Sequence, residues 1–222
     1  MDFSKLKIFD WLMLGQGTLI TIALCLAAIV GGGLIAMLAM TPTVWPKRWI
    51  LRAAVIGYVE FFRSTPLLLQ LIAIYFALPL VGLPIPAVVA AGIALILYSG
   101  AYLTEILRAG LEAVPRGQWE ASLSLGMSRA QVLRNVIAQQ ALRIVLPSIV
   151  SFIVMLVKGS AVVSVIGFSE LTRSGRLVVE WTREPFAVWI VVGLIYFLLC
   201  YPLSILGRRL EHRLGHGTST AA

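Results

Sequence analysis

The sequence predicts an all-α integral membrane protein with five transmembrane helices and short cytoplasmic helices. Hydrophobic residues make up 59% of the chain and charged residues 13%, whereas a soluble domain has about half apolar and about a quarter charged residues. Five segments are long and apolar enough to cross about 30 Å of hydrocarbon, which takes roughly 20 helical residues. Lys and Arg are also distributed unevenly between the connections, as in proteins that have a fixed orientation in a membrane.

The predicted spans extend along the whole chain, so we treat residues 1–222 as one transmembrane domain. The spans cover roughly residues 18–40, 53–80, 87–104, 136–157 and 186–207. The first is a retained span, because no charge occurs from Trp11 to Pro46 and a signal-peptide core has only about 7–15 apolar residues. The second and third spans share an uncharged stretch, in which a turn is predicted by Pro79, Gly82, Pro84 and Pro86.

The positions of Lys and Arg predict the orientation. If the crossings alternate, one side holds eleven of the 18, namely Lys47, Arg48, Arg52, Arg108, Arg116, Arg129, Arg134, Arg143, Arg208, Arg209 and Arg213. The other side holds Lys5, Lys7, Lys158, Arg173, Arg176 and Arg183. Because positive residues favour the cytoplasm, we expect a periplasmic N-terminus and a cytoplasmic C-terminus in a bacterial inner membrane. The net charge of +8 then reflects topology, and nucleic acid is not an expected partner.

The second span contains two charges, Glu60 and Arg63. Their spacing of three places both on one face of a helix. Charges inside a membrane usually face each other or a cavity, because they are costly to expose to lipid. The pair therefore either forms an ion pair that fixes helix packing or lines a pathway for solute.

The connection of residues 105–135 is predicted to contain two short helices that meet at Gly126. Trp119, Leu123, Met127 and Ala130 recur at nearly helical spacing. Three interpretations compete: a helix-turn-helix that binds DNA, an amphipathic helix at the membrane surface, and a docking helix for a cytoplasmic partner. The first is disfavoured, because both ends continue into spans and leave no room for the core of a DNA-binding domain.

No catalytic residue, cofactor or metal site is predicted. A phosphate-binding loop requires Gly-Lys-Ser or Gly-Lys-Thr at the start of a helix, and none of the four lysines follows a glycine. Any ATP must therefore be handled by a separate subunit. His212 and His216 have a spacing that could hold a metal on a helix, but no third ligand is nearby and a solvated tail is favoured.

The 98–147 region resembles the loop motif of bacterial ABC importer permeases. That motif reads Glu-Ala-Ala, three residues, Gly, nine residues, and then Ile-x-Leu-Pro. Glu120, Ala121 and Ser122 take the first three places, and Gly126 follows at the required spacing. The resemblance to the polar amino acid branch of that family (histidine, glutamine, arginine and opine importers) covers essentially the whole chain. It includes the segments FFRSTPLLLQL, AYLTEILRAGLEAVPRGQWEAS and KGSAVVSVIGFSEL.

The chain departs from the family pattern at three points. Ser122 replaces the second alanine, and Ala138 and Gln139 stand where the family has Leu-Pro. After Lys158 the family often has Asp-Thr-Ser, whereas this chain has Gly-Ser-Ala. The first two departures concern the bend of the docking loop, and the third concerns the assignment of a substrate from the family.

The resemblance implies a set of partners and a coupling site. Glu120, Ala121, Ser122 and Gly126 would dock the loop into a cleft of a cytoplasmic ATPase subunit. A second permease subunit, the same or homologous, would complete the channel in the lipid bilayer. A periplasmic solute-binding protein would deliver a small polar amino acid or an opine. The chain itself would perform no bond chemistry.

Polar residues within the apolar regions are candidates to line the solute pathway. These are Arg63, Tyr98, Ser99, Lys158, Ser160 and Ser164. Serine and tyrosine also commonly hydrogen-bond between membrane helices without any role in transport, so both interpretations stay open.

Two other classes of function are weighed against this one. A secondary transporter would need intramembrane carboxylates to carry ions, and the candidates are Glu60 and Glu105. Such transporters typically have inverted repeats, and none is evident in the sequence. A membrane enzyme or signalling scaffold would need a catalytic cluster, and none is evident either.

Overall fold

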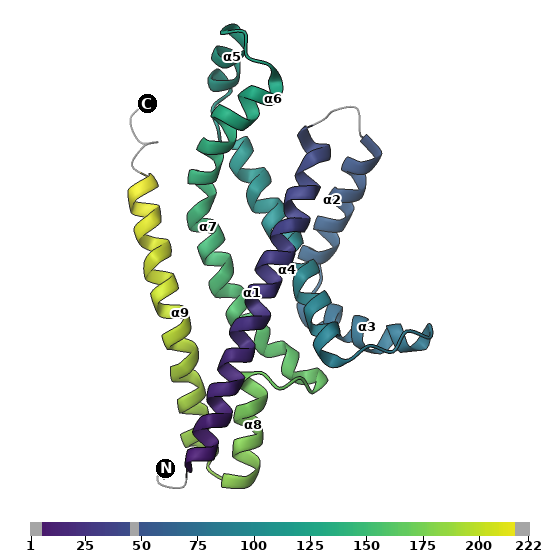
Figure 1. Cartoon of the computed structure of the whole chain (residues 1–222), viewed down its shortest axis with the longest axis vertical. Coiled ribbons are helices and arrows are strands. Elements are labelled where there is room, and N and C mark those ends of the chain that lie inside the picture. The colour runs from purple at the N-terminus through teal and green to yellow at the C-terminus, as the bar shows by residue number, and fades with distance from the viewer. Residues whose placement is uncertain (1–5, 45–48, 216–222) are drawn as a thin grey trace.

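The computed structural model describes residues 6–44 and 49–215, and these residues form helices and no strands (Figure 1). Four segments are each long and apolar enough to cross a membrane: Ile8–Thr41, Ala87–Glu112, Arg129–Ile166 and Pro185–Leu214. They correspond to the helices α1 (Ile8–Val44), α4 (Ala87–Glu112), α7 (Ala138–Gly159) and α9 (Pro185–Gly215). A fifth crossing is possible only if α2 (Trp49–Ser64) and α3 (Leu67–Leu80) together count as one span. The all-helical membrane fold predicted from composition is confirmed.

The second predicted span, residues 53–80, is not a single straight helix. Between α2 and α3 the chain bends by 106°. The cause is Pro66, which has no N–H to donate and pushes the residue before it away from the helical conformation. The buried Gln70 holds the bend, because its Nε2 donates to the carbonyl oxygens of Phe62 at 2.9 Å and Thr65 at 3.0 Å. These carbonyls at the end of α2 would otherwise lack partners.

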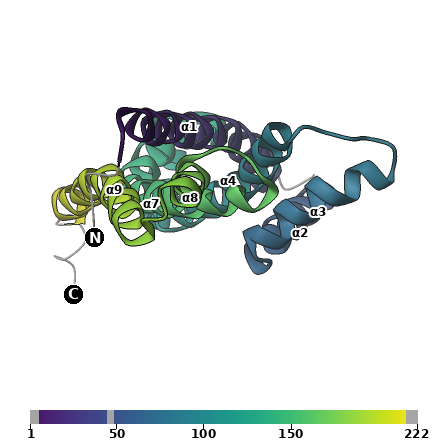
Figure 2. The same cartoon turned by 90° about the horizontal axis from the view of Figure 1, so that it is seen from below.

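The predicted turn between the second and third spans is confirmed. The α3 helix ends at Leu80, α4 begins at Ala87, and Gly82 has a φ of +82°. Only glycine adopts this left-handed conformation without steric cost. Both views show α3 projecting away from the rest of the helices (Figures 1 and 2).

Small residues let α1 and α4 approach closely, and this contact is the most extensive between any two helices described. A Cβ added to Gly32 would lie 2.6 Å from Ser99 Cβ, and one added to Gly31 would lie 3.0 Å from Ile96. Gly33, in contrast, has open space around its Cα. Gly31 and Gly32 therefore serve close helix packing, as small residues commonly do between membrane helices.

The connecting helices lie at opposite ends of the molecule. The short helices α5 (Arg116–Ser124) and α6 (Arg129–Val132) share one end with the C-terminal end of α9, and α8 (Leu171–Thr182) lies at the other end beside the start of α1 (Figure 1). The sites predicted at Lys5, Lys47, Arg48 and His216 lie outside the described residues.

The α8 helix is anchored by the buried carboxylate of Glu170, which is fully inaccessible to solvent. Its two oxygens accept hydrogen bonds from the backbone N–H groups of Thr172 at 2.9 Å and Arg173 at 2.8 Å. Tyr196 of α9 donates to the same carboxylate at 3.2 Å. Burial raises the pKa of Glu170 above its usual value, because desolvation disfavours the charged form.

Replacing Glu170 should therefore destabilise the protein in a graded way. Glu170→Ala removes a helix cap worth about 1 kcal/mol and leaves buried N–H groups unpaired at about 1–3 kcal/mol. The apparent Tm in detergent should fall by about 4–16 °C, since the two costs sum to about 2–4 kcal/mol and each kcal/mol lowers Tm by roughly 2–4 °C for a chain of this size. Glu170→Gln keeps an acceptor oxygen and should lose less.

The pH dependence checks the same group. Because its pKa is raised in the folded protein, stability is fully present below the ordinary glutamate pKa and is lost as the pH rises through the raised value. As the pH increases from the ordinary glutamate pKa to the raised pKa of Glu170, the Tm of the wild type should therefore fall relative to the Tm of Glu170→Gln. A constant difference across this range would contradict a raised pKa.

Candidate functional site

The loop between α4 and α7 is built as a rigid helical hairpin. The α5 helix ends at Ser124, Gly126 turns the chain with a φ of +80°, and α6 starts at Arg129. Ser128 and Gln131 form a reciprocal capping box, in which each side chain bonds the other's backbone N–H. The prediction of two short helices meeting at Gly126 is confirmed.

A small hydrophobic core ties this hairpin to the spans. Val114, Val132, Ile137 and Ala141 are buried together, and Trp119 and Met127 pack against them. Since Ala141 belongs to α7 and Val114 directly follows α4, the hairpin and the ends of both spans share one packing unit. Close by, Gly110 of α4 lies against Val145 of α7 so tightly that any side chain at position 110 would clash.

The predicted coupling residues divide into exposed and buried groups. Glu120 and Ala121 are exposed on α5, and Leu125 at the tip of the turn is 82% exposed. Ser122 is buried, and its hydroxyl donates to the carbonyl oxygen of Gln118 at 2.7 Å. No ion pair joins Glu120 to Arg116 in the described part of the chain.

The junction between hairpin and span differs from the family motif. Residues Leu133–Ile137 form a π-helical turn that leads directly from α6 into α7. The motif's proline would stand at Gln139, where α7 is already a regular helix. The backbone therefore passes this point through one widened turn rather than through a proline break.

Arg63 forms its ion pair with Glu105 of α4, not with Glu60. Arg63 Nη1 lies 3.3 Å from Glu105 Oε1, and the guanidinium also lies 5.7 Å from the ring centre of Tyr102. Glu105 and Glu112 in turn pair with Arg108 at 2.6 Å each. Of the two interpretations of Glu60 and Arg63, the mutual ion pair does not form: the bend after α2 places the end of that helix against α4, where Arg63 meets Glu105, while Glu60 is exposed.

The other predicted pathway residues lie around the same bend. Tyr98 contacts Tyr102 at 4.6 Å and Phe152 of α7 at 6.5 Å between ring centres. Ser99 is fully buried, and its hydroxyl has no hydrogen-bond partner among the described residues. Lys158, at the end of α7, is exposed. Ser160 and Ser164 are buried in the 3₁₀ helix η3 (Ser160–Ile166), which packs against α3.

Sequence reasoning missed Gln70 as a functional candidate. Its Nε2 closes the α2 helix, but its Oε1 is buried without a hydrogen-bond partner in the part of the chain that the structure describes. A buried unpaired acceptor is costly, so this atom marks the bend as a place where a donor is expected. The signal in the sequence is a polar residue four positions after Pro66 in an apolar stretch.

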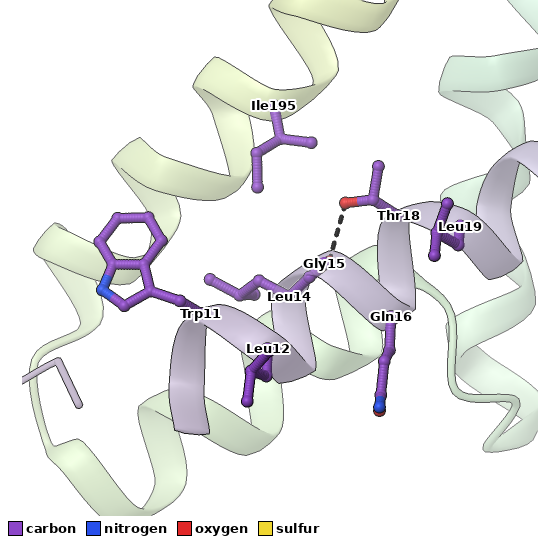
Figure 3. Close-up of a pocket in the computed structure, with 8 residues that line it drawn as sticks. All are labelled: Trp11, Leu12, Leu14, Gly15, Gln16, Thr18, Leu19 and Ile195. Atoms are coloured by element: carbon purple, nitrogen blue, oxygen red, sulfur yellow. Dashed lines mark hydrogen bonds between the residues drawn. The ribbon is translucent and has the colours of Figure 1, made fainter. Parts of the chain in front are cut away.

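A pocket of about 640 Å³ lies elsewhere, between α1 and α9 (Figure 3). Its walls are apolar apart from Gln16 and Thr18, and the Thr18 hydroxyl donates to the carbonyl oxygen of Leu14 at 2.8 Å. It contains no charged side chain and is not a candidate for binding a charged solute.

Fold and site together define a membrane permease, a bundle of spanning helices with an ordered hairpin at one end. Residues 28–216 match the family described as "Binding-protein-dependent transport system inner membrane component". The chain therefore belongs to this family, and it is a transport component rather than an enzyme.

Individual relatives agree with this assignment. The chain is 34% identical to a putative glutamine transport system permease of Rickettsia felis, over 91% of this chain and 93% of that protein. It is 35% identical to an arginine transport system permease of Bacillus subtilis, over 90% and 91%. Its structure resembles a chain in the crystal structure of an amino acid ABC transporter with histidines. That match has a TM-score of 0.85 and 35% identity, and covers 96% of this chain and 99% of that one.

The ion pair across α2 and α4 can be tested by its effect on stability. Glu105→Gln should lower the apparent Tm in detergent, because it breaks the ion pair with Arg63. Breaking an exposed ion pair costs about 1 kcal/mol and breaking a buried one costs about 3 kcal/mol, and we expect a cost between these two values. Glu112→Gln is the matched control and should have a much smaller effect, since Glu112 is more exposed. Arg63→Ala combined with Glu105→Gln should cost less than the sum of the two single changes. Strict additivity would show that the two side chains do not interact.

Proposed function

We propose that this protein is the permease subunit of an ABC importer for polar amino acids or related opines in a bacterial inner membrane. The observation that carries the proposal is the ordered, exposed hairpin between α4 and α7, which bears Glu120 and Gly126 at the motif spacing. Relatives named as glutamine and arginine permeases support the solute class. In this proposal the partners are ATPase subunits, a second permease subunit and a periplasmic solute-binding protein.

In the proposed coupling step the hairpin enters a cleft of the ATPase subunit. Glu120 would accept charge-assisted hydrogen bonds there, which are stronger than neutral ones. Because the hairpin shares a hydrophobic core with the ends of α4 and α7, a movement of α5 would be passed to both spans as a rigid body. Gly126 keeps the tip compact enough to fit.

The proposed solute pathway runs beside the bend between α2 and α3. Irregular backbone at membrane depth is tolerated only where protein covers it or water reaches it. The residues proposed to line it are Arg63 in α2, Tyr98 and Ser99 in α4, Lys158 in α7, and Ser160 and Ser164 in η3, which packs against α3 and α4. Glu105 is already paired with two arginines, which disfavours it as an ion carrier in the alternative of a secondary transporter.

A second permease subunit would complete this pathway. Ser64 and Pro66 are exposed at the bend, and α3 projects away from the other helices (Figure 2). A second copy, or a homologous subunit, placed against α3 would cover the bend from the open side. The buried serines would then face solute only when the helices around them separate.

Substitutions in the hairpin test the proposed coupling. Glu120→Ala and Gly126→Asp should abolish ATP-driven uptake while the protein still inserts into the membrane. Loss of a charge-paired interface contact costs about 2–5 kcal/mol, and an aspartate at a φ of +80° strains the turn. The measurements are solute uptake and copurification of the ATPase subunit. Normal uptake with full ATPase retention in both variants would contradict the coupling role.

The orientation is tested with fusion reporters. We expect the end of the molecule that holds α5, α6 and the end of α9 to be cytoplasmic, because it carries the larger number of arginines. A reporter active only in the periplasm should be silent after Ala222 and active after Gly82 or Arg176. Activity at the C-terminus would reverse the orientation.

A further inference from the structure

A groove between α7 and α9 belongs neither to the hairpin nor to the proposed pathway. It has a volume of about 240 Å³. Its lining residues are Val150, Ser151, Val154, Leu203, Ser204, Gly207, Arg208 and Glu211. In both views α9 stands on the side of the bundle away from α2 and α3 (Figures 1 and 2). The groove therefore lies apart from the surface of α3 that the proposed second permease subunit covers.

The groove crosses the boundary between the hydrocarbon and the lipid headgroups. The α9 helix carries no charged residue from Pro185 to Gly207, and Arg208 is the first charge after this run. Because roughly 20 helical residues cross the hydrocarbon, Arg208 lies where the headgroups begin. Glu211 lies about 4.5 Å further along the helix, at about 1.5 Å per residue. On the other side of Arg208 the groove walls are apolar and face the acyl chains.

Small residues keep this groove open while the two helices stay close. A Cβ added to the buried Gly207 would lie 3.4 Å from Val150 Cγ1 and 4.0 Å from Ser151 Oγ. The Ser204 hydroxyl donates to the carbonyl oxygen of Cys200 at 2.9 Å, so its hydrogen is used within α9. The charged side chains at the outer end are therefore the main groups that the groove offers to a ligand.

Arg208 and Glu211 supply one positive and one negative charge at the outer end of the groove, and both are exposed. Their spacing of three places them on one helix face, yet neither forms an ion pair in the described part of the chain. Helical periodicity places Arg209 and Arg213 on other faces of α9. Arg143 of α7 lies nearer the hairpin and does not line the groove. The groove thus presents a balanced pair of charges that have no partner.

The order of these charges matches a phospholipid with an amine headgroup. In such a lipid the phosphate is next to the glycerol, and the ammonium is attached further from the hydrocarbon. Arg208, nearer the hydrocarbon, is suited to bind the phosphate through two hydrogen bonds. Glu211, further out, is suited to accept hydrogen bonds from the ammonium. A phospholipid without an ammonium would leave Glu211 beside a phosphate of the same charge.

We propose that the groove between α7 and α9 binds phosphatidylethanolamine, with Arg208 receiving the phosphate and Glu211 the ammonium. The acyl chains leave the groove past Val154 and Leu203. A lipid held in this way contacts both helices and stabilises their packing. Since α7 continues directly from the hairpin through the π-helical turn, the lipid acts beside the proposed coupling element. The site itself depends neither on the transported solute nor on the proposed function.

The experiment measures lipid binding to the full-length chain by native mass spectrometry. Protein in detergent is mixed with equal amounts of phosphatidylethanolamine, phosphatidylcholine and phosphatidylglycerol, whose acyl chains differ in mass. The wild type should retain phosphatidylethanolamine about tenfold better than phosphatidylcholine, which is the effect of one hydrogen bond between charged groups. The quaternary ammonium of phosphatidylcholine has no N–H to donate to Glu211, although its charge is the same.

Substitutions in the groove separate the two contacts. Glu211→Ala should bring the ratio of phosphatidylethanolamine to phosphatidylcholine close to one, because the acceptor is lost. Arg208→Ala should lower the retention of all three lipids about tenfold, because each has a phosphate. Arg209→Ala is the matched control and should behave as the wild type, since Arg209 adjoins Arg208 but does not line the groove. Glu211→Arg should reverse the preference towards phosphatidylglycerol.

Three results would overturn the proposal. One is equal retention of phosphatidylethanolamine and phosphatidylcholine by the wild type, or an unchanged ratio in Glu211→Ala. A second is a wild-type preference for phosphatidylglycerol, which would indicate an anionic lipid bound with the help of Arg143. The third is equal loss of lipid in Arg208→Ala and Arg209→Ala, because binding would then follow the charge of the helix end and not the groove. The wild-type ratio depends on no variant, so the test stays decisive if a substitution destabilises the chain.

Discussion

Backbone polar groups inside hydrocarbon must find their hydrogen-bond partners within the protein, since no water is available there. Long helices satisfy this requirement without help, and α1, α4, α7 and α9 are such helices. Wherever a helix stops or breaks at depth, a side chain has to supply the missing partner. Gln70 does so at the end of α2. Outside the candidate spans, Glu170 supplies the same kind of partner at the start of α8. Two of the buried polar side chains, Gln70 and Glu170, are therefore explained by the helix ends that they close.

The same constraint locates the candidate sites. The bend between α2 and α3 exposes backbone that needs either a protein cover or water, and Arg63 with its partner Glu105 lies beside it. At the end with the hairpin, α5 and α6 need no membrane, so they expose Glu120 and Leu125 and bury Ser122 and Val132 in a core of their own. The two sites are joined by α4, which runs from Ser99 past Glu105 to the start of the hairpin. A displacement of α4 would therefore reach both sites.

Several features could be predicted from the sequence because each depends on neighbours along the chain. The turn at Gly126 requires a positive φ that other residues rarely adopt, and the turn at Gly82 requires the same. Close packing at Gly32 follows from the absence of a side chain. The partner of Arg63 could not be predicted in this way. Spacing offered Glu60 as one possible partner, whereas the actual partner, Glu105, is set by the angle at which α2 meets α4.

By itself, the sequence determined that the chain crosses a membrane as helices, where the short hairpin stands and which residues form its tip. These properties depend on hydropathy and backbone preference over a few residues at a time. Only the tertiary structure decided that Pro66 divides the second span with a 106° bend, that Glu105 receives Arg63, and that Asp10 holds the far end of α8 through Trp181. The last two depend on the angle between helices that are distant in sequence, and that angle is set by packing of the whole bundle rather than by any local pattern. Pro66 breaks the helix locally, but the direction that α3 then takes depends on the same packing.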